Sequence, residues 1–211
     1  WEISDSDLEP IKRALASYSD HPIYTDRVNR NIESEVTSIT RDQLWHAMFV
    51  GLLTSRQDSS HNSPVSRLLR SQPFPLSLAN CEKKVDLSKY ILGILKAYRG
   101  IRNYNNISDY ANYNLALLSK KYWNPLNEIN EMMPFIDFNS EREAVNKLFI
   151  LKGIKSKQAR NMLQHLGVIK YEIPIDSRVM HWLNNQCDYP LVVDSKVLQS
   201  ENFYCFVLDS I

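Results

Sequence analysis

The sequence predicts an all-α protein, and three features of its composition lead to this prediction. The chain has 211 residues, 44% of them hydrophobic and 10% aromatic, which is enough for one substantial core or two small adjoining lobes. Only five glycines occur, which argues against β-hairpins, propeller blades and glycine-rich phosphate loops. The nine prolines are therefore expected to mark the ends of helices.

Charge and cysteine content exclude several classes of protein. Lysine and arginine number 25 against 24 acidic residues, so a DNA-binding function would need a local concentration of positive charge. Three cysteines are too few for a four-cysteine zinc or iron–sulfur site, and we expect no metal or cofactor. No apolar run approaches the roughly 18 residues of a membrane span, and the cysteine usage favours an intracellular protein.

Apolar spacing predicts the first helices. At the start of the chain, within residues 2–35, one helical stripe is expected from Leu8, Ile11, Leu15 and Tyr18. Residues 41–53 are mostly apolar, and this predicts a helix that is buried on most sides. A long polar loop over residues 54–64 follows directly, and such loops often present functional side chains.

The remaining helices are predicted at residues 65–69, 87–99 and 107–121, and from Ser140 onward, where Glu143 completes the spacing of a capping box. Residues 191–193 are the one candidate strand. No repeat or flexible linker interrupts the chain. We therefore expect residues 1–211 to form a single compact unit.

The positive charge is concentrated in residues 144–171, which contain no acidic residue. Within this run, Gly153 permits a tight turn, Ile154 can enter the core and Ser156 is a suitable N-cap. These features predict a helix–hairpin–helix over about residues 144–167, whose backbone amides and helix N-terminus would bind a phosphate. A plain helical hairpin on a basic surface is the alternative. The six basic residues are Lys147, Lys152, Lys155, Lys157, Arg160 and Lys170.

A single aspartate, Asp176, follows the apolar segment Ile-Pro-Ile and lies 19 residues after Lys157. Together with the segment Leu-Lys-Gly-Ile-Lys-Ser-Lys-Gln-Ala over residues 151–159, this arrangement resembles the helix–hairpin–helix DNA glycosylases, which include endonuclease III and the 8-oxoguanine glycosylases. The resemblance implies a two-lobed helical fold with the hairpin at the cleft between the lobes. It also implies that Lys157 is the nucleophile and Asp176 the catalytic carboxylate.

The chain departs from the family pattern at three positions. Lys152 stands where proline is usual, Lys155 where the second hairpin glycine is usual, and Arg178 where histidine often lies. The four-cysteine cluster loop of the endonuclease III branch is absent. The resemblance is therefore to the cluster-free 8-oxoguanine branch.

The implied chemistry fits these two residue types. Cleavage of the bond between base and sugar builds positive charge on the sugar, which the carboxylate of Asp176 would stabilise. Lys157 would attack as a neutral amine, and the positive charges of Lys155 and Arg160 would disfavour its protonated form. The alternatives are that Asp176 is an N-cap and Lys157 a solvated helix lysine.

Other residues are assigned to DNA contact or to a base pocket. Gln57 or Arg56, in the polar loop, would fill the space left by a flipped nucleotide, although a solvated loop is equally compatible with the sequence. The aromatic candidates for stacking on the flipped base are also compatible with core packing. The assigned DNA-binding residues are Gly153, Lys155, Arg160, Gln57, Arg56 and Arg178, and the base-pocket residues are Trp182, Phe203 and Phe206.

The sequence therefore predicts a base-excision DNA glycosylase with abasic-site lyase activity that removes an oxidised purine such as 8-oxoguanine. Its expected partner is double-stranded DNA with a damaged base, and we expect a monomer in the cytoplasm, at the bacterial nucleoid, or in another intracellular compartment. A glycosylase for a different damaged base is one alternative. A helix–hairpin–helix DNA-binding module without catalytic activity is the other.

Overall fold

The computed structural model describes residues 4–29, 33, 38–55, 57–134, 137–186, 189 and 191–211. These residues form α-helices and short 3-10 helices with no strand among them, which confirms the all-α prediction. The elements are α1 (Asp5–Ala16), α2 (Pro22–Val28), α3 (Arg41–Leu53), α4 (Pro64–Leu69), α5 (Leu78–Glu82), α6 (Leu87–Ala97), α7 (Tyr104–Lys120), α8 (Asn124–Met132), α9 (Phe138–Lys147), η2 (Leu148–Ile150), α10 (Ser156–His165), α11 (Ser177–Gln186), η3 (Val197–Gln199) and α12 (Glu201–Asp209).

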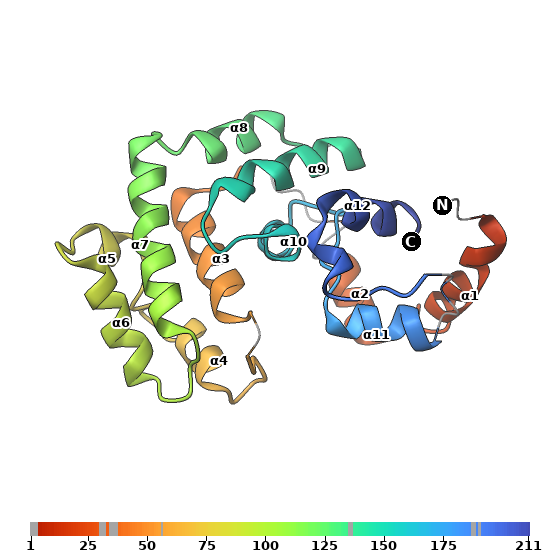
Figure 1. Ribbon diagram of the computed structural model, residues 1–211, viewed down its shortest axis with the longest axis horizontal. Helices are drawn as coiled ribbons and strands as arrows, with labels where there is room; N and C mark the ends of the chain where they lie inside the picture. Colours follow the sequence, from red (N-terminus) through yellow and green to blue (C-terminus); the bar gives the residue numbers. More distant parts are fainter. Residues whose placement is uncertain are drawn as a thin grey trace.

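The larger of two hydrophobic clusters, which we call cluster one, contains buried side chains between Ile39 and Ile169. Its central helix is α3, which lies between α7 and α10 (Figure 1). Most α3 side chains are buried, as the apolar run predicts, and the Trp45 indole donates a hydrogen bond of 2.9 Å to the carbonyl of Leu76. Cluster one therefore provides a rigid support for α10.

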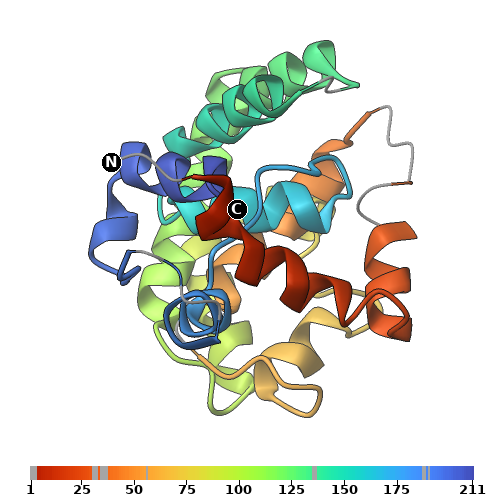
Figure 2. The same ribbon diagram turned by 90° about the vertical axis from the view of Figure 1, so that its right-hand side faces the viewer.

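The smaller cluster, cluster two, combines Ile11 of α1 with buried residues between Ile175 and Leu208. Its helices α1, α11 and α12 lie on the right in Figure 1, on the far side of α10 from α7, and they are in front in Figure 2. The first and last helices of the chain thus contribute to the same core. The segment between Ile169 and Ile175 connects the two clusters.

Four of the predicted helices are confirmed by α3, α4, α6 and α7, with ends within three residues of the expected positions. The first stripe is confirmed in part, because Ile11 of α1 is buried while Leu15 and Tyr18 are exposed. No described helix is long and apolar enough to cross a membrane.

Two predicted helix starts are wrong. Asp137 caps α9 by accepting a hydrogen bond of 2.8 Å from the backbone amide of Ser140, so Ser140 lies inside the helix rather than at its cap. The second hairpin helix begins with Ser156 itself, and Lys155 occupies the N-cap position without a side-chain hydrogen bond. In both cases the helix starts earlier than the serine predicts, because another residue occupies the cap.

The predicted strand at residues 191–193 is also wrong, since these residues have no strand structure. Val193 donates a hydrogen bond of 2.8 Å to the side-chain oxygen of Asn184 and accepts one of 2.7 Å from its amide nitrogen. One asparagine side chain therefore satisfies the backbone groups that a neighbouring strand would otherwise have paired.

Candidate functional site

The predicted hairpin is present as α9, η2, a turn and α10. Gly153 in the turn has a φ of +85°, and a β-carbon there would lie 2.4 Å from Cδ2 of Tyr110 and 2.8 Å from Cδ2 of Leu52. The position therefore requires glycine for both its conformation and its space. Ile154 enters cluster one, as expected, and is 1% exposed.

Asn114 of α7 anchors the hairpin turn. Its side-chain oxygen accepts a hydrogen bond of 2.7 Å from the backbone amide of Lys152, and its amide nitrogen donates one of 3.0 Å to the carbonyl of the same residue. Asn114 is fully buried, so water does not compete for these bonds. The sequence analysis missed this residue, because it lies 38 positions before Lys152.

The basic residues of the acid-free run have different environments. Lys147 forms ion pairs with Glu128 at 2.9 Å and Glu143 at 3.4 Å. The ammonium group of Lys152 lies over the rings of Tyr110 and Tyr113, 5.5 and 5.4 Å from their centroids. Lys147 and Lys152 therefore both have partners within the protein.

Lys155 and Lys157 lie at the start of α10, where the first backbone amides have no partner within the helix. Lys155 is exposed and Lys157 is half-buried. Among the residues that the structure describes, none forms a hydrogen bond or ion pair with either ammonium group. Two uncompensated positive charges thus lie at the positive end of a helix dipole, an arrangement that favours binding of an anion.

Arg160 is placed differently from the sequence prediction, because its side chain is fully buried. Its guanidinium group donates a hydrogen bond of 2.7 Å to Glu172 and one of 2.6 Å to Glu201. The assignment of Arg160 to DNA contact is therefore corrected, since no surface of the side chain is left for a phosphate. Its charge is also offset by two carboxylates, so it does not present a free positive charge to Lys157.

Asp176 directly precedes α11, and its carboxylate is 20% exposed. It accepts backbone hydrogen bonds of 2.8 Å from Arg178 and 3.1 Å from Val179, and it pairs with the exposed Arg178 guanidinium at 2.6 Å. Burial opposes ionisation, but these hydrogen bonds outweigh it and hold the pKa of Asp176 below its usual value. The carboxylate is therefore ionised at neutral pH, and it also caps the helix.

Lys157 is the second residue of α10, and Asp176 is the residue directly before α11, the next α-helix along the chain. Within the described residues, no direct hydrogen bond or ion pair joins the two side chains. Arg178 instead occupies one oxygen of the Asp176 carboxylate. The Arg178 side chain is 91% exposed, so it can move away from the carboxylate without disturbing the packed interior.

The polar loop after α3 lies beside the first turn of α10, because Gln158 donates a hydrogen bond of 3.2 Å to the hydroxyl of Ser55. The Gln57 amide donates to the carbonyl of Leu53 and accepts a hydrogen bond of 2.7 Å from the backbone amide of Arg102. Gln57 thus holds the loop in place, and both ends of its side chain are in use. Arg56 lies outside the described residues.

The three aromatic base-pocket candidates do not line a common pocket. Trp182 lines an open depression along α11 with a volume of about 510 Å³, bordered also by Ser177, Arg178, Val179, His181 and Gln186. Phe203 and Phe206 of α12 pack against cluster two with their ring centroids 6.0 Å apart. Of the three, only Trp182 combines an aromatic surface with an open cavity and with Arg178.

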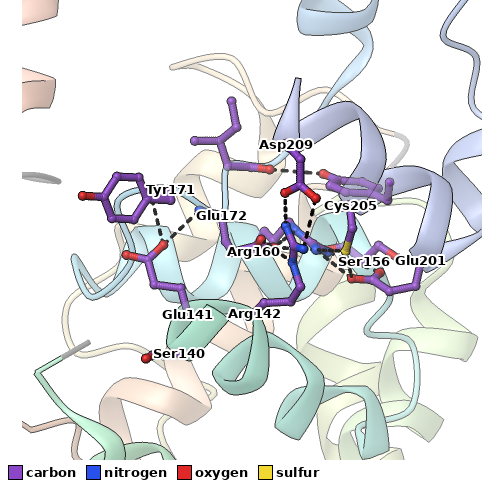
Figure 3. Close-up of polar contacts among 12 residues, drawn as sticks. Ser140, Glu141, Arg142, Ser156, Arg160, Tyr171, Glu172, Glu201, Cys205 and Asp209 are labelled. Atoms are coloured by element: carbon purple, nitrogen blue, oxygen red, sulfur yellow. Dashed lines mark hydrogen bonds and ion pairs between the residues drawn. The ribbon is translucent and has the colours of Figure 1, made fainter. Parts of the chain in front are cut away.

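A buried network of charged side chains joins α9, α10 and α12, and the sequence analysis did not predict it (Figure 3). Glu172 is 1% exposed and accepts hydrogen bonds from Arg160 and, at 2.9 Å, from Arg142. Arg142 also reaches Asp209 at 2.5 Å. The signal was available in part, because Arg160 lies three residues before Leu163, on the apolar face of α10.

Glu141 is a second buried carboxylate, 2% exposed, and it holds the segment after α10. It accepts backbone hydrogen bonds of 2.6, 2.7 and 2.9 Å from Lys170, Tyr171 and Glu172, as Figure 3 shows in part. Burial raises the pKa of Glu141, and these hydrogen bonds offset the increase only in part. The path of the chain towards Asp176 is thus fixed by a side chain of α9.

Comparisons with protein-family models, with curated proteins and with solved structures give no match. Within the described part of the chain, no group of three or more histidine, cysteine, aspartate or glutamate side chains is placed to hold a metal ion.

Proposed function

We propose that this protein is a base-excision DNA glycosylase of the helix–hairpin–helix type, with abasic-site lyase activity and an oxidised purine such as 8-oxoguanine as substrate base. The observation that carries the proposal is the half-buried Lys157. It has no partner among the described residues and follows directly after a turn that requires glycine. A lysine held in this way, beside a site for a phosphate, suits nucleophilic attack on a DNA sugar.

The turn and the start of α10 supply the DNA contact in this proposal. A DNA phosphate would lie against the first backbone amides of α10, which have no partner within the helix, and against Lys155, which is exposed and has no ion-pair partner in the described chain. Arg178 and the polar loop near Ser55 would extend the contact to the strand on either side. The base would be flipped out of the duplex, and the open depression beside Trp182 and Arg178 is our candidate receptor for it.

In the reaction, Lys157 first gives a proton to solvent, and its amine then attacks C1′ of the deoxyribose. The base leaves with the electrons of the glycosidic bond and takes up a proton from water, while the ionised Asp176 stabilises the positive charge that builds up on the sugar. Transfer of a proton from the attached nitrogen to the ring oxygen O4′ opens the ring and gives a Schiff base between Lys157 and C1′. Loss of a proton from C2′ then expels the 3′ phosphate, and this β-elimination breaks the strand.

Borohydride trapping tests the proposal directly. Reduction of the Schiff base on a duplex with 8-oxoguanine or an abasic site is expected to give a covalent adduct, which Lys157→Gln abolishes. Lys147→Gln is the matched control, because Lys147 already pairs with Glu128 and Glu143 and lies outside the proposed DNA contact. Equal trapping by both variants, or no adduct and no strand cleavage on any lesion, would overturn the proposal.

One observation favours the alternative of a DNA-binding module without catalysis. The Asp176 carboxylate is already engaged by two backbone amides and Arg178, as it would be if it served only as a helix cap. Asp176→Asn separates the two functions. The glycosylase predicts a large loss of base removal with DNA affinity retained, whereas a pure cap predicts no change beyond stability.

A further inference from the structure

The start of α10, which carries Lys157, is attached to α12. Arg160 donates a hydrogen bond of 3.1 Å to the carbonyl of Ser156, the residue before Lys157. The same guanidinium group donates to both carboxylate oxygens of Glu201, at 2.6 and 3.3 Å. Ser156 directly precedes Lys157, and Arg160 lies one turn after Ser156. These bonds therefore hold the backbone at the start of α10 near the first turn of α12.

The segment that leads to Asp176 is attached to the same helix by Tyr204. The Tyr204 hydroxyl accepts a hydrogen bond of 2.5 Å from the backbone amide of Ile175 and donates one of 3.3 Å to the carbonyl of Ile173. A single oxygen atom thus holds two backbone groups immediately before Asp176. Tyr204 is 1% exposed, so water does not replace either bond.

Arg160 and Tyr204 also contact each other, so the attachments of α10 and of the segment before Asp176 to α12 are joined. The Arg160 guanidinium carbon lies 4.2 Å from the centroid of the Tyr204 ring, a cation–π contact. Arg160 additionally binds Glu172, which belongs to the segment before Asp176. In Figure 3 the Arg160 guanidinium lies among Glu172, Glu201 and Cys205, at the centre of these contacts.

We propose that Tyr204, Arg160 and Glu201 are positioning residues that set the distance between Lys157 and Asp176 by attaching both to α12. This inference rests on the proposed glycosylase function and names the residues that align its two catalytic groups. Among the described residues, no buried side-chain nitrogen or oxygen lacks a hydrogen bond, and a fully satisfied buried network is rigid. Rigidity matters here because a displacement of about 1 Å at reacting groups costs on the order of 100-fold in rate.

The test compares two tyrosines in cluster two. Tyr204→Phe keeps the ring over Arg160 and removes only the hydroxyl that holds Ile173 and Ile175. Tyr189→Phe is the matched control, because its buried hydroxyl bonds to Ser210 and does not touch the segment before Asp176. Both variants lose one buried hydroxyl, so a purely structural role predicts similar effects from both.

The measured quantities are the single-turnover rate constant for base removal, the dissociation constant for duplex DNA and the exchange rate of the Ile175 amide hydrogen. We expect Tyr204→Phe to lower the rate constant about tenfold with DNA affinity within twofold. Amide exchange at Ile175 should accelerate in this variant. Tyr189→Phe should leave all three quantities within twofold of the wild type.

Glu201→Gln provides a second variant if Tyr204→Phe folds poorly, since the Glu201 side chain is 27% exposed and glutamine keeps its shape. It too should lower the rate constant without a matching loss of DNA affinity. If the wild type removes the base and both variants behave like Tyr189→Phe, the positioning role is wrong and the glycosylase proposal stands. If the wild type removes no base and forms no adduct, the glycosylase proposal fails, and this inference fails with it.

Discussion

Lys157 and Arg160 lie one helical turn apart in α10, and their environments are opposite. Lys157 is half-buried and has no hydrogen-bond or ion-pair partner in the described chain. Arg160 is fully buried, contacts two carboxylates and stacks on an aromatic ring. The first turn of α10 thus keeps its positive charge for an external partner, while the second turn uses its charge inside the protein.

This difference shows that basic residues which are close in the sequence need not lie on the same surface of the folded protein. The acid-free run contains six basic residues, but Lys147 and Arg160 are neutralised by glutamates from outside it. The positive charge that remains available to an external anion is a smaller group centred on Lys155 and Lys157. A near-neutral protein with such a group should bind DNA weakly and with a strong dependence on salt.

The largest expected effect comes from removing the buried charge. Arg160→Leu leaves Glu201 without its cation and Glu172 with Arg142 alone, and it should lower the free energy of unfolding by about 3–5 kcal/mol. Lys157→Leu, one turn earlier, should change it by no more than about 0.5 kcal/mol. Urea denaturation of both variants measures these changes. Equal destabilisation would contradict the prediction that only the Arg160 side chain contributes strongly to stability.

The hairpin turn before these residues should be nearly as sensitive. Gly153→Ala introduces a β-carbon that overlaps Tyr110 and Leu52 at a positive φ, and we expect a loss of about 2–3 kcal/mol. Gly93→Ala is the control, because Gly93 lies within α6 with nothing within 4 Å of the new atom. That variant should gain about 1 kcal/mol in the same denaturation experiment, since alanine favours helix.

The salt dependence of DNA binding tests which lysines are available. Lys155→Ala should reduce the slope of log affinity against log salt concentration by about 0.9, the value for one phosphate contact. Lys147→Ala should leave the slope unchanged, because Lys147 already pairs with Glu128 and Glu143. DNA titrations of both variants at several salt concentrations measure the slope. A reduced slope in both variants would mean that a lysine with an ion-pair partner in the protein can contact DNA as readily as one without.

The smallest effect concerns Asp176, whose charge, unlike that of Lys157, is paired. Because its pKa is lowered in the folded protein, its ionised form contributes stability above the unfolded value of about 3.9, and this contribution is lost as the pH falls through the folded value. Asp176→Asn should cost about 0.5 kcal/mol at pH 7, and this cost should shrink as the pH falls below about 3.9. Denaturation of the variant and the wild type over this pH range measures the difference in the free energy of unfolding, and a difference that does not change with pH would show that the charge makes no contribution.

Local sequence patterns were sufficient for the fold class and for most helices. The apolar run at α3 and the glycine turn at Gly153 are properties of neighbouring residues, and both predictions are confirmed. The helix starts at Ser140 and Ser156 were wrong, because several nearby residues compete for a cap and only the folded backbone selects one. The arrangement of two lobes with the hairpin at their cleft stays a prediction.

The residues that hold the candidate site in place could not be predicted from local sequence patterns. Arg160 meets Glu172 and Glu201 over separations of 12 and 41 residues, so charge counting alone assigned it to the surface. Tyr204 was one aromatic residue among several near the end of the chain. The helical position of Arg160 beside Ala159 and Leu163 was the available signal, because a cation on an apolar face requires buried acidic partners.

The division of the buried side chains between clusters one and two has a consequence for synthesis on the ribosome. All the residues of cluster one precede Lys170, so this core can assemble while the rest of the chain is still being made. Arg160 belongs to a helix of that early core, but its partner Glu201 is translated 41 residues later. Until α12 docks, the Arg160 guanidinium has Glu172 but not Glu201 as a carboxylate partner, so the docking of α12 completes this buried junction.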